Sequence, residues 1–111
     1  YYDIYQDGST STSLRSGAGS PTSRVNGAAY SGTTRDDLHT AVAGGSPVIL
    51  TYESLDLSSW TKFGFGNYEQ YSVGRSVEGD MYGCVLLDRA LTTDERSDLE
   101  AYLAAKSGVT L

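Results

Sequence analysis

The fold is decided by the closing stretch of the chain, which begins Gly79-Asp-Met-Tyr-Gly-Cys-Val-Leu-Leu-Asp-Arg-Ala-Leu91 and continues Thr92-Thr-Asp-Glu-Arg-Ser-Asp-Leu-Glu-Ala-Tyr-Leu103. Its first part is almost wholly apolar between two aspartates, which predicts a strand over residues 79–88. Cys84 lies inside this run and is expected to be a small buried side chain. The second part predicts a helix that closes the chain.

This helix carries a signal at each end. Thr92 and Glu95 stand three residues apart, the spacing of a capping box in which each side chain accepts from the other's backbone N–H. Gly108 supplies the left-handed residue that commonly ends a helix. We expect a helix over about residues 92–107. It should dock through an apolar stripe of residues spaced by three or four: Leu99, Tyr102, Leu103 and the aliphatic stem of Lys106.

Upstream, the chain reads as strands and polar turns with one short helical stretch. Thr34 to Ala43 is that stretch, because Thr34 or Asp36 is suited to cap it and Leu38 and Val42 share a face. Asn26-Gly27 is typical of a hairpin tip, since both residues tolerate positive φ. Strands are expected in the ranges 1–5, 24–30, 47–52 and 60–65.

Residues 79–96, with the ending Tyr102-Leu103, Lys106 and Gly108, resemble the closing segment of concanavalin A-like, or laminin-G-like, jelly-roll domains. This ending occurs especially in phage and bacterial surface proteins. The resemblance implies a mainly β fold: an antiparallel jelly-roll β-sandwich with one C-terminal α-helix. Residues 1–111 would form one such domain or the C-terminal part of one. A complete sandwich of this type is longer, so either strands are missing or a neighbouring subunit covers an open sheet edge.

Charge and composition exclude several classes of partner. The chain has a formal net charge of −6 and only eight dispersed Lys and Arg residues, which argues against nucleic acid and against an anionic membrane surface. No apolar stretch reaches the roughly 20 residues that span a bilayer. A single cysteine excludes an internal disulfide. The chain opens on Tyr1 without a signal peptide, so we expect a processed product or the ordered part of a longer polypeptide.

The sequence predicts no catalytic site, and we expect no enzyme activity. Glycosidases need two carboxylates that face one another, whereas Glu53 and Asp56 flank a turn. His39 stands alone in a polar stretch, which favours a surface role over a zinc or triad role. We expect no cofactor. Calcium is the one ion whose binding the sequence leaves open, because the resembled domains often bind it through loop carboxylates. We assign no ligand to it.

Aromatic residues in loops predict a glycan site instead. Tyr and Trp offer flat faces to a sugar ring, and Asn and Arg pair with its hydroxyls. The best cluster is the stretch Asn67-Tyr-Glu-Gln-Tyr71. An alternative is that its two tyrosines pack at a sheet edge or against another subunit. The candidate glycan-binding residues are Trp60, Asn67, Tyr68, Tyr71 and Arg75.

The resemblance therefore implies a non-catalytic surface module of a phage or phage-like particle, such as a tail fibre, tail tip or head spike. Its expected partners are a host cell-surface polysaccharide and other virion subunits, in a homo-oligomer or larger assembly, at the virion surface or outside the cell. An alternative is a purely structural decoration or assembly domain that binds no sugar. A weaker alternative is a fragment of a secreted glycan hydrolase.

Overall fold

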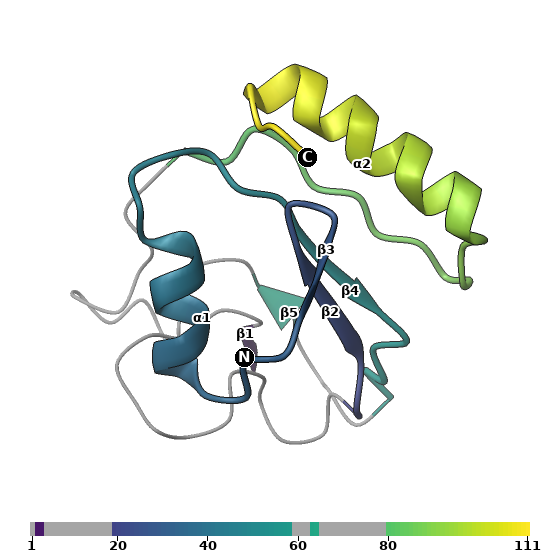
Figure 1. Cartoon of the computed structure of the whole chain (residues 1–111). Helices are drawn as coiled ribbons and strands as arrows, with labels where there is room; N and C mark the ends of the chain where they lie inside the picture. Colours follow the sequence, from purple (N-terminus) through teal and green to yellow (C-terminus); the bar gives the residue numbers. More distant parts are fainter. Residues whose placement is uncertain (1, 4–18, 59–62, 65–79) are drawn as a thin grey trace.

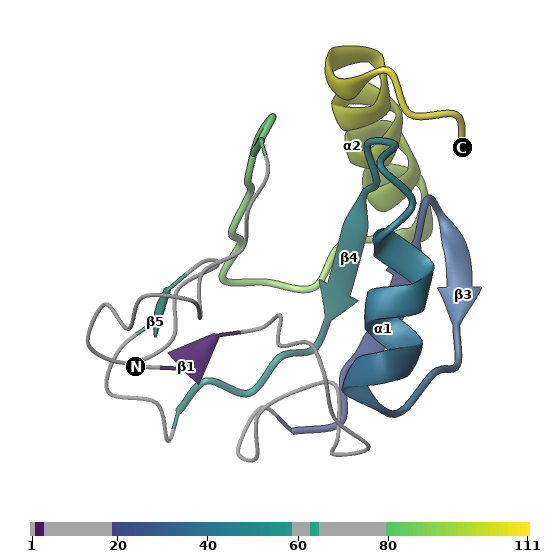
Figure 2. The ribbon, with the colours of Figure 1, turned by 90° about the vertical axis from the view of Figure 1, so that its left-hand side faces the viewer.

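The computed structural model describes residues 2–3, 19–58, 63–64 and 80–111. Within these ranges the chain forms a three-stranded antiparallel sheet with a helix on each face (Figures 1 and 2). The central strand is β2 (Thr22–Val25), flanked by β3 (Ala28–Tyr30) and β4 (Leu50–Glu53). Separately, β1 (Tyr2–Asp3) pairs in parallel with β5 (Phe63–Gly64).

A two-residue turn at Asn26-Gly27 joins β2 to β3. Both residues have positive φ, 50° and 77°, as the favoured hairpin turns require. The backbone N–H of Asn26 donates to the Ile49 carbonyl at 3.0 Å, and the Ile49 N–H donates to Asn26 Oδ1 at 2.9 Å. Ile49 is itself buried. The predicted hairpin is confirmed, and the strand predicted at 47–52 is confirmed as β4, which begins at Leu50.

The two faces of the sheet differ in chemistry. Residues that pair directly across an antiparallel ladder lie on the same face. Val25 pairs with Leu50, so one face carries apolar side chains. The opposite face is polar, because the alternating positions of β2 and β4 place on it the pairs Arg24–Thr51 and Thr22–Glu53.

Helix α1 (Arg35–Val42) covers one face of the sheet (Figure 2). The Asp37 N–H donates to Thr34 Oγ1 at 3.1 Å, and the Thr34 N–H donates to Asp37 Oδ2 at 3.0 Å, which closes a capping box. Leu38 is 1% exposed and lies in the core. The short helix predicted at Thr34–Ala43 is confirmed, so the chain has a second helix besides the terminal one.

Helix α2 (Thr93–Ser107) covers the other face. It is capped by Thr92 and ends at Gly108, whose φ is 75°, as predicted. Its buried residues, however, are Glu100 and Ala104. Tyr102 and Lys106 are exposed, and Lys106 Nζ lies 5.2 Å from the centre of the Tyr102 ring. The predicted stripe is therefore wrong for these two residues, because the sheet face that α2 meets is polar.

The stretch before α2 corrects a second prediction. Residues 80–91 form neither helix nor strand, and the side chains of 80–90 are exposed. Cys84 is a free, exposed thiol, so the expectation that it is buried was wrong. A strand exists only where a neighbouring strand supplies backbone partners, and no strand in the described part of the chain pairs with residues 80–88. The apolar run predicted a strand, but none of the strands that the structure describes pairs with it.

The predicted jelly-roll β-sandwich is wrong. Such a sandwich packs two sheets face to face. Here the described residues give one small three-stranded antiparallel sheet with α1 on one face and α2 on the other. Strands of three and four residues are too short and too few to form a sandwich. The charged face of β2 and β4 suits a helix with complementary charges better than it suits a second apolar sheet.

Candidate functional site

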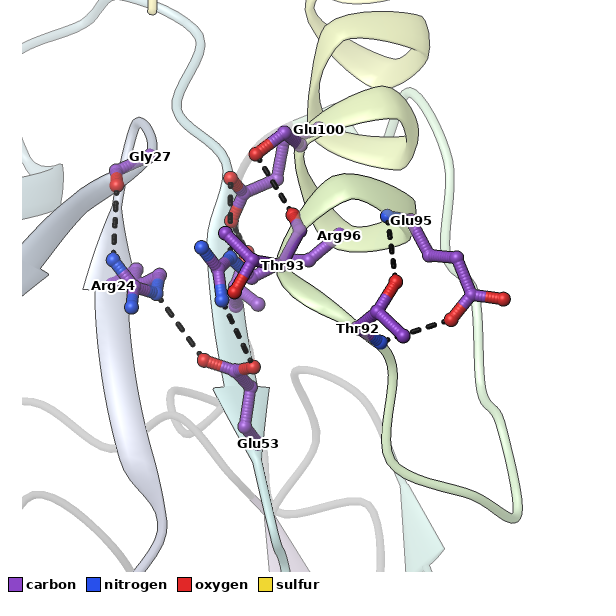
Figure 3. A network of polar contacts seen from close by, with 10 residues as sticks. Arg24, Gly27, Glu53, Thr92, Thr93, Glu95, Arg96 and Glu100 are labelled. Carbon is purple, nitrogen blue, oxygen red and sulfur yellow. Dashed lines mark hydrogen bonds and ion pairs between the residues drawn. The ribbon is translucent and has the colours of Figure 1, made fainter.

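Four charged side chains join α2 to the polar face of the sheet (Figure 3). Arg24 Nε on β2 donates to Glu53 Oε2 on β4 at 3.2 Å, and Arg96 Nη1 on α2 donates to Glu53 Oε1 at 3.3 Å. Arg96 Nε also lies 4.0 Å from Glu100 Oε2, within ion-pair distance. We call Arg24, Glu53, Arg96 and Glu100 the charged network. It contains two positive and two negative groups and is therefore neutral as a whole.

Glu53 is the centre of the charged network. Its partial burial alone would raise the pKa of the carboxyl, because burial disfavours the charged form. The hydrogen bonds and positive charges of Arg24 and Arg96 outweigh this effect and hold the pKa below its usual value. Glu53 is therefore ionised at neutral pH, which is the state that both arginines need.

Glu100 is the most buried member, at 5% exposure. Thr51 Oγ1 donates a hydrogen bond to its Oε1 at 2.6 Å. An isolated buried carboxylate is costly, but one that accepts a hydrogen bond and faces an arginine is tolerated. The hydroxyl of Thr51 thus fixes the middle of α2 to β4.

The charged network is a structural connection between a helix and a sheet. General acid–base catalysis needs a carboxyl that can reach a substrate proton, but each carboxylate here already faces an arginine or a hydroxyl. Sequence reasoning missed this connection. A signal was nevertheless present, because Thr51 and Glu53 alternate on one strand face and Arg96 and Glu100 stand one helical turn apart.

A second ion pair holds the start of α2. Arg89 Nη1 and Nη2 donate to Glu95 Oε2 and Oε1 at 3.0 and 2.8 Å, a bidentate geometry. The Thr92 N–H donates to the same carboxylate at 2.9 Å. The Arg89 hydrogen bonds and, next, the Thr92 N–H lower the pKa of Glu95 to about 2. The Arg89–Glu95 pair therefore fixes the corner at which α2 begins.

All five predicted glycan-binding residues lie outside the described residues, in the ranges 59–62 and 65–79. The structure therefore does not test that prediction. His39 is exposed on α1. In the ranges that the structure describes, no three His, Cys, Asp or Glu residues are grouped to hold a metal ion. The carboxylates of Asp56 and Asp80, which lie in loops where calcium ligands are commonly found, are both exposed.

An exposed apolar run is the most unusual surface in the described structure. Met81, Tyr82, Val85, Leu86 and Leu87 are between 44% and 64% exposed. We call residues Asp80–Arg89 the exposed segment. A Cβ added to Gly83 would lie 3.5 Å from Leu103 Cδ2, so the exposed segment passes against α2 at this point. Soluble monomers rarely expose a contiguous apolar patch of this kind unless it contacts another molecule.

Comparisons of the chain with protein-family models, with curated proteins and with solved structures found no match. Within the described ranges, no helix combines the length and the apolar character needed to cross a bilayer.

Proposed function

We propose that this chain is a non-catalytic assembly module, a domain that acts by contacting other protein subunits. The observation that carries the proposal is the exposed segment, in which five large apolar side chains stand in water. Covering them with protein would stabilise the complex by roughly 25 cal/mol for each Å² removed from water. The resemblance of the closing motif to phage and bacterial surface proteins supports a place on the surface of a virus-like particle.

The charged network gives a second line of support for the proposed assembly function. It fixes α2 to the sheet, so the exposed segment lies against an anchored helix that serves as its support. Interfaces that bind without large rearrangement are built on such supports, because less conformational freedom is lost on binding. The module thus has an anchored face and an apolar contact face.

Cys84 provides a direct test, because this thiol lies in the exposed segment and is the chain's single cysteine. A maleimide should label Cys84 rapidly in the dilute isolated chain and at least about tenfold more slowly in the assembly isolated from its natural source. Unfolding the assembly in denaturant should restore fast labelling, which controls for prior oxidation of the thiol. Equal labelling rates in the isolated chain and the assembly would overturn the proposal.

Glycan binding through Trp60, Asn67, Tyr68, Tyr71 and Arg75 is a second proposal. It is supported by the aromatic and polar composition of that stretch. An assembly module can also carry a glycan site, so the two proposals are compatible. A glycan array tests the second one independently of the cysteine experiment, because the array reports on sugars and the labelling reports on protein contacts.

A further inference from the structure

We propose that Asn26 is a site of spontaneous covalent modification, at which the folded hairpin restrains the loss of the side-chain amide as ammonia. The products are aspartate and isoaspartate. An asparagine followed by glycine reacts readily in an open chain, because Gly27 has no side chain to obstruct its backbone nitrogen. The reaction needs only water and the chain itself, so it is independent of the proposed assembly function.

The reaction has a ring-closing step and a hydrolytic step. In the first, the Gly27 backbone nitrogen bonds to Asn26 Cγ, the bond from Cγ to Nδ2 breaks, and the Gly27 N–H proton leaves with Nδ2 as part of ammonia. The product is a succinimide ring. In the second, water adds to one ring carbonyl and the C–N bond at that carbonyl breaks. Opening at Cγ gives aspartate, and opening at the main-chain carbonyl gives isoaspartate, whose backbone runs through the former side chain.

The folded hairpin holds Asn26 in a conformation that does not allow ring closure. The φ angles of Asn26 and Gly27, 50° and 77°, fit a type I′ turn. The closed ring requires a different ψ angle at Asn26 from the one that this turn imposes. The side chain is fixed as well, because Asn26 Oδ1 accepts from the Ile49 N–H at 2.9 Å while the Asn26 N–H donates to the Ile49 carbonyl at 3.0 Å. Ring closure therefore requires the contact with Ile49 to break.

Other parts of the chain also hold the turn in place. Arg24 Nη1 donates to the Gly27 carbonyl at 3.3 Å (Figure 3). A Cβ added to Gly27 would lie 3.6 Å from Glu100 Oε2 and 3.7 Å from Leu111 Cδ2, so α2 and the last residue lie against the turn. The backbone at Gly27 cannot rearrange freely while these contacts persist. The reaction should therefore follow the fraction of molecules in which the hairpin is open.

The two products should differ in their effect on the hairpin. Aspartate keeps the normal backbone and suits a two-residue hairpin turn before glycine, and its carboxylate can still accept from the Ile49 N–H. Isoaspartate adds a methylene group to the main chain at residue 26. The length of the turn sets the register of the two strands, in which Val25 pairs with Ala28. We therefore expect isoaspartate to disrupt the hairpin and aspartate to preserve it.

Peptide mapping by mass spectrometry tests the control by the fold. The chain is incubated in mildly alkaline buffer with and without denaturing urea and then digested with trypsin, which releases Asn26 within residues 25–35. We expect Asn26 to react at least about tenfold faster in urea, because only open molecules react. A synthetic peptide of residues 22–30, incubated in both buffers, corrects for any effect of urea on the chemistry itself.

The same digest contains an internal control. The second asparagine of the sequence, Asn67, is released within residues 63–75 and precedes Tyr68 in place of a glycine. In urea, where the fold no longer matters, Asn67 should react more slowly than Asn26, because the Tyr68 side chain obstructs the attacking nitrogen.

A brief digestion under native conditions tests the effect of each product. The chain is aged in urea, refolded and exposed to a nonspecific protease. The isoaspartate form should be cleaved first, because an opened hairpin exposes the chain, and the surviving protein should be enriched in asparagine and aspartate. Asn26→Asp is the matched control, since it carries the charge of both products on a normal backbone. It should resist the protease as well as the wild type does.

Two outcomes would overturn the inference. In one, Asn26 reacts as fast in the folded chain as in urea after the peptide correction, which would show that the hairpin does not restrain the reaction. In the other, Asn26 reacts no faster than Asn67 in urea, which would show that it is not a reactive site. Equal survival of aspartate and isoaspartate forms under the protease would contradict the expected disruption of the hairpin.

Discussion

At the scale of single residues, Glu53 decides how α2 is fixed to the sheet. It accepts hydrogen bonds from an arginine on β2 and from another on α2, so its loss would leave both positive charges without their shared partner. Leaving a partly buried charge unpaired costs more than the intact pair contributes. The network is therefore sensitive to substitutions that keep the shape of a side chain but remove its charge.

Glu53→Gln should lower the free energy of unfolding by about 1–2 kcal/mol, because the amide cannot match two charged hydrogen bonds. The measurement is urea denaturation at neutral pH. Asp98→Asn is the matched control, since it removes one negative charge from an exposed position on α2. It should change stability by less than about 0.5 kcal/mol. Equal effects of the two variants would show that the network does not stabilise the fold.

At the scale of elements, both helices begin at capping boxes and the hairpin turns at a pair suited to positive φ. The capping box of α2, a cap at the start of α1 and the turn were predicted from local sequence. These features can be predicted because each depends on residues that are close in sequence. In a capping box, a side chain accepts a hydrogen bond from a backbone N–H three residues away, and the turn depends on the φ preferences of its own two residues. The prediction for residues 79–88 failed because a strand depends on a distant partner, which no local pattern reveals. The buried face of α2 was misjudged for a similar reason, since a polar sheet face selected Glu100 over the apolar Tyr102.

The hairpin offers a direct test at this scale. Gly27→Ala should destabilise the protein by about 1 kcal/mol or more, because an L-residue with a side chain resists the left-handed conformation. Space is not the obstacle: the new Cβ would lie 3.6 Å from Glu100 Oε2, an ordinary contact. Gly44→Ala is the control, in open space and without a positive φ, and should be neutral or slightly stabilising. Thermal melts of both variants provide the comparison.

Acid should weaken the start of α2. The pKa of Glu95 is about 2 in the folded chain, below the unfolded value of about 4.3. Its stabilisation is therefore complete above that unfolded value and is lost as the pH falls toward 2. Glu95→Gln keeps a capping side chain but removes the charge. Denaturation series at pH 7, 4 and 2.5 should show a smaller loss of stability on acidification in this variant than in the wild type, and parallel curves would contradict the assignment.

At the scale of the whole molecule, the described residues divide into an anchored side and a contact side. The charged network was outside the reach of sequence reasoning because it joins β2, β4 and α2 across up to 76 positions of sequence, from Arg24 to Glu100. The apolar character of the exposed segment was evident in the sequence, but its exposure was not. The predicted glycan residues, in turn, lie outside the described part of the chain and keep the status of a prediction.

Assembly and glycan binding should be separable but coupled through avidity. Tyr68→Ala with Tyr71→Ala should weaken binding to a glycan and leave the melting curve and the protection of Cys84 in the assembly unchanged. Leu86→Glu should leave binding to a soluble monovalent sugar unchanged but weaken binding to a densely coated glycan surface by about tenfold or more, because an assembly that forms through the exposed segment engages several sugars at once. Isothermal titration with the free sugar and surface plasmon resonance on the coated surface separate the two effects. If the tyrosine variant loses the assembly instead of the sugar, these tyrosines belong to a subunit contact, which is the alternative that the sequence left open.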